Sequence, residues 1–187
     1  GLIYSEVLES AAFIAKVRIE GLRDYGGALS PFNAFQIIQG LETLELRILK
    51  HSKNALELAE WLQKRPEVKW VNYPGLKSSP FKHLSDKYLP KGQSGIVTFG
   101  VHGGYEAAKL IADTTKLFSL LANIGDTKSL IIHPASTTHQ QLNDDAQLST
   151  GVTKDLIRLS VGIENIEDLK SDLREVFVSV KTKQLQD

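Results

Sequence analysis

Arg158 is the residue whose type and surroundings most clearly suggest chemistry. It lies in the run Leu156-Ile-Arg-Leu-Ser-Val161, whose apolar residues predict a buried strand. A guanidinium in such a strand needs a partner, because an unpaired buried charge is costly. Two interpretations follow. Arg158 either captures a carboxylate with its planar fork of donors, or it forms a structural ion pair, for instance with Asp155 or Glu164.

Histidines are the next candidates. His133 and His139 flank a Pro-Ala-Ser-Thr-Thr turn, but no third ligand is evident and the spacing matches no common zinc site. We therefore predict no metal site, and expect these two side chains to make local hydrogen bonds around the turn. His51, His83 and His102 lie among polar residues and are predicted to be on the surface.

Other catalytic patterns are missing from the sequence. There is no cysteine, no glycine-rich phosphate loop and no G-x-S-x-G elbow, and the glycine pairs at 26–27 and 103–104 are those of simple turns. The sequence therefore offers a binding group without a complete catalytic set.

Composition excludes two further classes of function. Charged residues make up 24% of the 187 residues and balance to a formal net charge of zero, which argues against a nucleic-acid binder. No run approaches the roughly 18 apolar residues of a membrane span, and the start lacks a signal-peptide pattern. We expect a soluble, cytoplasmic protein without nucleic-acid or membrane partners.

The first third of the chain is predicted to be helical. Apolar residues recur at helical spacing over 6–23 and again over 32–62, with Ser30 as cap and Pro31 in the first turn. The second stretch is either one very long helix or two nearly continuous ones, and Pro66 ends it.

The rest of the chain interleaves short apolar strands with helices. We predict strands over 68–73, 96–101, 117–121, 129–133 and 156–161, and helices over 105–113 and 166–180. Residues 76–94 and 139–155 are polar, and the second of these segments has room for a helical turn. The fold class is α/β, of the α+β type, with helices packed on a mixed or antiparallel sheet.

Six ordered motifs of the sequence are distinctive when taken together. They are Ser-Pro-Phe-Asn-Ala-Phe (30–35), Gln-Gly-Leu-Glu-Thr-Leu-Glu-Leu-Arg (39–47), Asn-Ala-Leu-Glu-Leu-Ala-Glu-Trp-Leu (54–62), Val-Asn-Tyr-Pro-Gly-Leu (71–76), Ser-Leu-Ile-Ile-His-Pro-Ala-Ser-Thr-Thr-His (129–139) and Ile-Arg-Leu-Ser-Val-Gly-Ile-Glu (157–164). In this order they resemble the Cys/Met-metabolism enzymes that use pyridoxal phosphate, and the resemblance covers the chain from about Gly1 to Val180. The stretches at 22–27 and 121–126 are more similar to the O-acetylhomoserine sulfhydrylase branch of that family than to its cystathionine lyases or synthases.

This resemblance implies the C-terminal part of a fold-type I enzyme. Residues 1–30 would be the tail end of a large cofactor-binding domain, 31–65 a long connecting helix and 66–180 a small domain with a mainly antiparallel sheet and helices on one face; 181–187 would be a frayed tail. With pyridoxal phosphate as electron sink, such enzymes eliminate acetate from O-acetylhomoserine, and sulfide then adds to give homocysteine. Relatives assemble as dimers or tetramers, so a homo-oligomer is implied.

Three residues of the substrate site are carried over by motif. Arg158 matches the arginine that grips the substrate α-carboxylate. Asn123 falls where many relatives carry a serine that lines the carboxylate site, and its amide is expected to donate a hydrogen bond there. Thr138, in the Pro-Ala-x-x-Thr-His turn, would support the same pocket, unless that turn is purely structural.

The family's Schiff-base lysine is the main departure. It belongs to a Ser-x-Thr-Lys motif upstream of every segment seen here, together with the rest of the cofactor site. Thr-Lys pairs occur at 115–116, 127–128, 153–154 and 182–183, but none has the full motif. We expect the N-terminal cofactor domain to be missing from this chain and the chain alone to be inactive. The alternative is a freestanding, non-catalytic binding module derived from this fold.

Overall fold

The structure, a computed structural model, describes residues 4–184. Its chain divides into two compact units, one ending at Leu44 and the other beginning at Glu45. Among the described residues, no helix is both long and apolar enough to cross a membrane.

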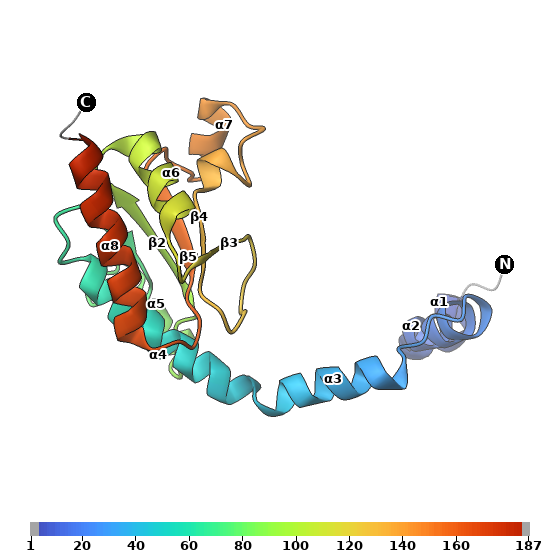
Figure 1. Cartoon of the computed structure of the whole chain (residues 1–187). Helices are drawn as coiled ribbons and strands as arrows, with labels where there is room; N and C mark the ends of the chain where they lie inside the picture. Colours follow the sequence, from blue (N-terminus) through green and yellow to red (C-terminus); the bar gives the residue numbers. More distant parts are fainter. Residues whose placement is uncertain (1–3, 185–187) are drawn as a thin grey trace. The chain divides into compact units, whose positions relative to one another are not determined.

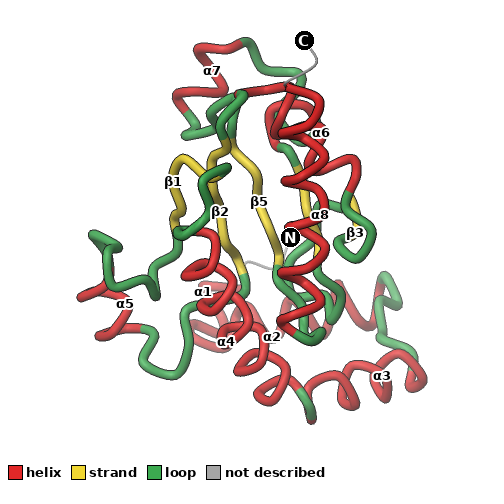
Figure 2. Tube along the Cα trace, turned by 60° about the vertical axis from the view of Figure 1, so that its left-hand side comes forward, coloured by secondary structure: helices red, strands yellow, loops and turns green. Residues whose placement is uncertain are grey.

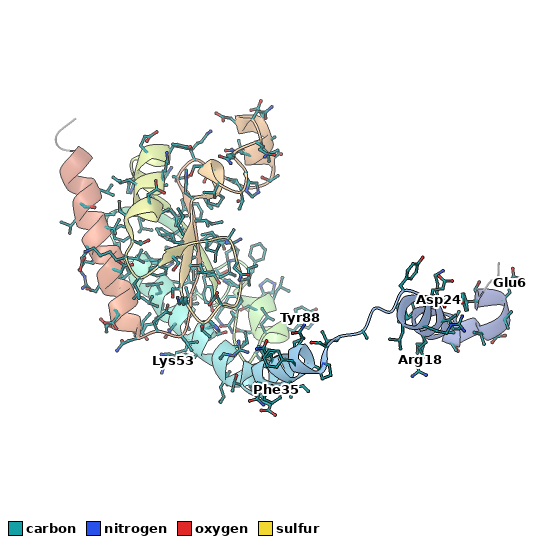
Figure 3. All side chains as sticks on the ribbon, turned by 45° about the vertical axis from the view of Figure 1, so that its right-hand side comes forward. Glu6, Arg18, Asp24, Phe35, Lys53 and Tyr88 are labelled. Carbon is teal, nitrogen blue, oxygen red and sulfur yellow. The ribbon has the colours of Figure 1, made fainter. Side chains whose placement is uncertain are left out.

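The first unit consists of helical segments whose side chains are largely exposed. Its segments are α1 (Tyr4–Leu8), a 3₁₀ turn (Glu9–Ala11), α2 (Ala12–Lys16), a π-helical stretch (Val17–Asp24) and α3 (Pro31–Glu42). The helix predicted over 6–23 is therefore a succession of short helical pieces. Side chains such as Arg18 and Asp24 project outward from them (Figure 3).

Helix α3 begins as the sequence predicts. The Ser30 hydroxyl accepts a hydrogen bond from the Asn33 N–H at 3.1 Å, and Pro31 occupies the first turn. The helix ends at Glu42, and α4 (Leu44–Leu62) begins two residues later. Residues 32–62 therefore form two nearly continuous helices, not one very long helix.

The second unit contains a five-stranded sheet with helices. Besides α4, the described elements of this unit are β1 (Val68–Asn72), α5 (Lys82–Tyr88), β2 (Ile96–Val101), α6 (Gly104–Thr114), β3 (Ser119–Leu120), β4 (Leu130–Ile132), a 3₁₀ turn (Pro134–Ser136), α7 (Asp144–Ser149), β5 (Leu156–Ser160) and α8 (Ile166–Gln184).

The sheet is mainly antiparallel, as predicted, in the spatial order β1-β2-β5-β4-β3. Only the short β3–β4 pairing is parallel among the described strands. β5, the last strand in the chain, lies at the centre between β2 and β4 (Figure 2). A central strand is held by hydrogen bonds on both edges, so its side chains occupy well-defined positions.

One face of the sheet is covered by helices, among them α6 and α8 (Figure 1). Alternate strand residues such as Phe99, Ile157 and Leu159 are fully buried there, in one cluster with residues of α4, α6 and α8. This arrangement confirms the predicted fold class with helices on one face. The other strand residues, Arg158 among them, lie on the opposite face of the sheet.

Three boundaries differ from the sequence prediction. The polar segment 76–94 contains the short helix α5, and the strand predicted over 117–121 keeps only two paired residues. Helix α8 continues to Gln184, beyond Val180. Of the predicted frayed tail 181–187, residues 185–187 lie outside the described residues.

Candidate functional site

Arg158 occupies the middle of the central strand, on the face without helices. It lies directly opposite Thr98 of β2 on one side and Ile132 of β4 on the other, and Thr98 is in turn opposite Asn72 of β1. Residues opposite one another in antiparallel strands point to the same face. The four side chains therefore form a row across the open face of the sheet, with the guanidinium as its charged member.

The Arg158 guanidinium is only partly satisfied by the protein. Its Nη2 donates to the main-chain carbonyl oxygen of Asn123 at 2.9 Å. Its Nε is buried and has no hydrogen-bond partner among the described residues. Buried donors are nearly always paired, so this N–H calls for an acceptor that the described residues do not supply.

The structural ion pairs proposed as an alternative are not formed. Asp155 accepts from Trp70 Nε1 at 3.3 Å and pairs with Lys69 at 3.6 Å. Glu164 accepts from the Ser129 backbone N–H at 2.6 Å and from its hydroxyl at 2.9 Å. No ion pair of Arg158 occurs within the described part of the chain, so the interpretation that it balances Asp155 or Glu164 is wrong.

An open hollow of about 360 Å³ surrounds the row of side chains. Strands β1, β2, β4 and β5 form its floor, and two segments rise beside it, the Pro134–His139 turn and residues 150–152. The residues that line it are Trp70, Asn72, Thr98, Ile132, Pro134, Thr138, His139, Thr150, Gly151, Val152, Leu156 and Arg158. The hollow combines apolar walls with one charged donor, which suits a small molecule bearing an anionic group.

The three predicted site residues come close together, although one does so in an unexpected way. Arg158 and Thr138 both line the hollow. Asn123 contacts Arg158 through its main-chain carbonyl oxygen, while its side-chain Oδ1 accepts from the Ile124 N–H at 2.8 Å. Here Asn123 fixes the guanidinium by its backbone, a contact that residue type alone could not reveal.

Sequence reasoning missed Asn72, Thr98 and Trp70 as lining residues. They lie on β1 and β2, far from Arg158 in the sequence, and adjoin it only through the strand order. The alternation of buried and exposed residues along a strand could have revealed Thr98, because this polar residue lies in β2 between the buried Val97 and Phe99.

Asp155, the hydrogen-bond partner of Trp70, is a buried acid whose environment keeps it ionised. Burial raises the pKa of its carboxyl, but hydrogen bonds, including the one from Trp70, and the nearby Lys69 ammonium outweigh it and bring the pKa below its usual value. The resulting carboxylate fixes the Trp70 indole, one of the lining side chains.

The two histidines of the turn make the predicted local hydrogen bonds. His133 has Nδ1 2.8 Å from the Ser136 hydroxyl and donates through Nε2 to the Lys154 carbonyl oxygen at 2.9 Å. His139 Nδ1 lies 2.8 Å from the Thr138 hydroxyl. Burial lowers the pKa of His133, which favours the neutral ring. No group of three potential metal ligands occurs among the described residues.

One histidine prediction is wrong. His51 is 2% exposed, and its Nδ1 lies 2.6 Å from the Val161 carbonyl oxygen. It shares a face of α4 with Ala55, Leu58 and Leu62, spaced four, seven and eleven residues later, which places it against the sheet. His83 and His102 are exposed, as predicted.

A polar cluster of Asn54, Ser129, Gly162 and Glu164 fixes the end of β5, the strand that carries Arg158. Asn54 of α4 donates to the carbonyl oxygens of Gly162 at 3.0 Å and Glu164 at 2.9 Å. The Ser129 hydroxyl, which donates to Glu164, accepts from the Gly162 N–H at 2.8 Å. These contacts join α4, β5 and the segment before β4, so they set the position of the strand that carries Arg158.

Solved structures share this fold with substantial sequence identity. An O-acetylhomoserine (thiol)-lyase from Campylobacter jejuni, described with N'-pyridoxyl-lysine-5'-monophosphate, aligns with a TM-score of 0.81 and 48% identity over 91% of this chain and 41% of its own. An O-acetylhomoserine sulfhydrylase from Wolinella succinogenes aligns with a TM-score of 0.73 and 38% identity over 93% and 46%, respectively. The chain therefore has the fold of part of a pyridoxal-phosphate enzyme.

Sequence comparison gives the same family. The model of the Cys/Met metabolism PLP-dependent enzymes matches residues 1–178, and the chain belongs to this family. It is 57% identical to O-acetyl-L-homoserine sulfhydrylase of Leptospira meyeri over 90% of its length, and 50% identical to O-acetyl-L-homoserine sulfhydrylase 1 of Thermus thermophilus over 95%. It spans 38% and 42% of those proteins, about two-fifths of their length.

Pyridoxal phosphate, the cofactor of the family, does not fit the hollow as a covalent group. Such a cofactor is held through a lysine amine, and none of the lining residues is a lysine. The nearby Lys154 is paired with Asp144 at 2.6 Å and lies over the Tyr105 ring. The hollow thus presents the guanidinium of Arg158 and no lysine to which the cofactor could attach.

Proposed function

We propose that this chain supplies the substrate-carboxylate half of an O-acetylhomoserine sulfhydrylase site. The whole enzyme would replace the acetate of O-acetylhomoserine by sulfide and so produce homocysteine. The observation that carries the proposal is the Arg158 guanidinium, which lies in an open hollow with a buried Nε–H that no described residue accepts.

In this proposal Arg158 binds the α-carboxylate of the amino acid. Nη2 is tied to the Asn123 carbonyl oxygen, so the orientation of the planar group is fixed before the substrate arrives. The free Nε–H and a remaining guanidinium N–H then donate to the two carboxylate oxygens, a geometry that lysine cannot reproduce. A carboxylate held at two points fixes the direction of the Cα–H bond that must be broken.

Thr138 is proposed to line the same substrate from the side. Its hydroxyl lies 2.8 Å from His139 Nδ1, so His139 sets the direction in which that hydroxyl can donate or accept. Trp70 and Val152 give the hollow apolar walls, which shield one side of the carboxylate–guanidinium pair from water and so strengthen it.

The cofactor would supply the electron sink for acetate elimination, from a domain outside these 187 residues. Two observations support this: the chain spans about two-fifths of its curated relatives, and it contains no Ser-x-Thr-Lys segment. We also propose that the first unit lies against that domain or against another subunit of a homo-oligomer. Its exposed large apolar side chains support this, among them Phe13 at 78%, Tyr25 at 86% and Phe32 at 67% exposure.

The test is the activity of the full-length protein. Purified enzyme loaded with pyridoxal phosphate should convert O-acetylhomoserine and sulfide to homocysteine and acetate in equal amounts. A reading frame without an upstream Ser-x-Thr-Lys segment, together with no homocysteine formed, would refute the proposal and favour a freestanding amino-acid-binding module instead.

A further inference from the structure

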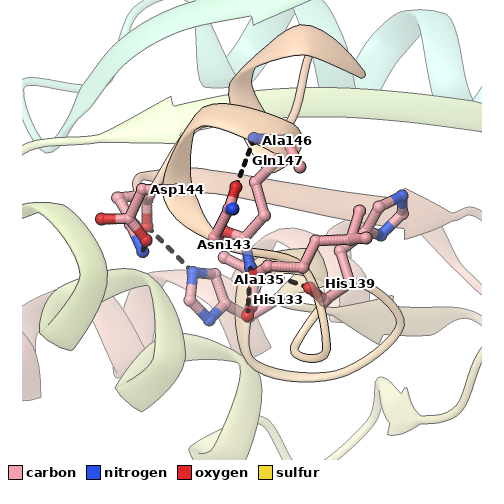
Figure 4. Close-up of polar contacts among 9 residues, drawn as sticks. His133, Ala135, His139, Asn143, Asp144, Ala146 and Gln147 are labelled. Atoms are coloured by element: carbon pink, nitrogen blue, oxygen red, sulfur yellow. Dashed lines mark hydrogen bonds and ion pairs between the residues drawn. The ribbon is translucent and has the colours of Figure 1, made fainter.

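Gln147 is a buried polar residue that the proposed binding of the substrate does not use. It lies on α7 and is 3% exposed. Its side-chain Nε2 points at three main-chain carbonyl oxygens, those of His139 at 2.8 Å, Ala135 at 3.2 Å and Leu142 at 3.3 Å. Figure 4 shows this amide between Ala135 and His139. One side chain therefore joins both ends of the 134–142 loop.

The main chain of the same residue holds a second segment. The Gln147 carbonyl oxygen accepts from the Val152 N–H at 3.0 Å, the Thr150 N–H at 3.1 Å and the Thr150 hydroxyl at 2.8 Å. These contacts close the tight turn that leads from α7 toward β5. The turn includes Gly151 at a φ of +82°, a conformation that side-chain-bearing residues rarely adopt.

These two segments are the walls of the Arg158 hollow. Thr138 and His139 come from the first, and Thr150, Gly151 and Val152 from the second. Gln147 does not line the hollow itself, but its side chain contacts the first wall and its main-chain carbonyl oxygen contacts the second. Among the residues that the structure describes, neither wall is held by the regular hydrogen bonds of a sheet, so the position of each depends on individual contacts like those of Gln147.

We propose that Gln147 is a positioning residue, which holds the Thr138 wall and the Thr150–Val152 wall at the separation that admits an amino-acid substrate over Arg158. This inference rests on the proposed function, since it assigns Gln147 a role in that same site. Glutamine suits the role because its amide supplies two N–H donors without a charge, and all the groups it meets are acceptors.

Glutamate at this position distinguishes a role of the amide donors of Gln147 from a role of its packing volume alone. It has the same size, but its carboxylate would face three carbonyl oxygens without a proton to donate. Taking up a proton restores one donor. The damage caused by Gln147→Glu should therefore shrink as the pH falls, which loss of packing alone would not do.

The experiment compares Gln147→Glu with Gln141→Glu, an exposed neighbour, in the full-length enzyme loaded with cofactor. We expect Gln147→Glu to raise KM for O-acetylhomoserine about tenfold near pH 8, with kcat changed less than about threefold and cofactor content unchanged. The ratio of the KM of Gln147→Glu to that of the wild type should become smaller as the pH is lowered. The KM of Gln141→Glu should equal that of the wild type at every pH.

Two outcomes would overturn the inference: a KM for Gln147→Glu equal to that of Gln141→Glu, or a rise in KM that does not depend on pH. If Gln147→Glu does not accumulate as folded enzyme, Gln147→Met provides the test, because it keeps the volume and adds no charge. It should raise KM at every pH, and an unchanged KM refutes the role. Arg158→Ala in parallel separates the two claims: if KM is insensitive to Arg158, the proposed function itself fails.

Discussion

Arg158 Nη2 donates a 2.9 Å hydrogen bond to the main-chain carbonyl oxygen of Asn123, while Nε of the same guanidinium is buried without an acceptor among the described residues. Nη2 is thus anchored by the protein, while the Nε–H is left to donate to an acceptor from outside the described residues. An anchored guanidinium has already lost much of its side-chain freedom, so less entropy is lost when a carboxylate binds.

The first prediction concerns the turn after the strand that carries Arg158. A methyl group at Gly162 would collide with Glu164 Oε2 and the Thr127 carbonyl oxygen and would lie 2.6 Å from the Ser129 nitrogen. Gly162→Ala should therefore destabilise the chain by about 3 kcal/mol or more. The free energy of unfolding in urea measures this.

Gly40→Ala is the matched control for that substitution. Gly40 lies within α3, and apart from its chain neighbours and the backbone of its own helix, no described atom lies within 4 Å of an added methyl group. Because alanine is the better helix former, this change should stabilise the helix by up to about 1 kcal/mol. A Gly162→Ala chain as stable as the wild type would show that the polar cluster below the site is not rigid.

His133 should make stability depend on pH in the weakly acidic range. Burial lowers its pKa in the folded state, so below its ordinary pKa of about 6.5 the unfolded chain binds the proton more readily. The stabilising contribution of neutral His133 is complete above that value and is lost as the pH falls toward the folded-state pKa.

Unfolding of the 187-residue chain at several pH values between about 5 and 8 tests this. The loss of stability on acidification should be smaller in His133→Gln than in the wild type. Equal pH dependence in the two chains would mean that His133 does not titrate differently in the folded and unfolded states.

The isolated chain should not retain pyridoxal phosphate. None of the residues that line the hollow is a lysine, and Lys154 is already engaged by Asp144 and Tyr105. After incubation with the cofactor and dialysis, the visible absorbance of the chain should equal that of the Lys154→Ala variant. Retained absorbance that this variant loses would contradict the proposal that the cofactor lysine lies elsewhere.

Much of the fold follows from periodicity in the sequence. The predicted strands over 68–73, 96–101 and 156–161 each agree with the observed strand to within one residue, because each is a short β-branched or aromatic run bounded by turn residues. Helix α5 was missed because Pro80, Pro90 and Gly92 mark the segment as a loop, although Phe81, Leu84 and Tyr88 recur in it at helical spacing.

The site was only partly predictable. Motif resemblance predicted Arg158, Asn123 and Thr138 as site residues, but the places of Thr98 and Asn72 depend on the order in which strands pair, which local sequence does not determine. The same holds for Asn123, whose contact is made by a backbone atom, and for Gln147, whose three acceptors are backbone carbonyls of a loop. Because every residue carries a backbone carbonyl, the residue type does not reveal which of them takes part in such a contact.

The most direct test of the account is the KM for O-acetylhomoserine of full-length Arg158→Ala. We predict a rise of about a hundredfold with cofactor content unchanged, because two charge-assisted hydrogen bonds to the carboxylate are lost, and a smaller rise for Arg158→Lys. Arg174→Ala serves as control, since it removes a guanidinium that stacks on Trp61 rather than one in the hollow. An Arg158→Ala enzyme with the KM of the wild type would contradict the central claim.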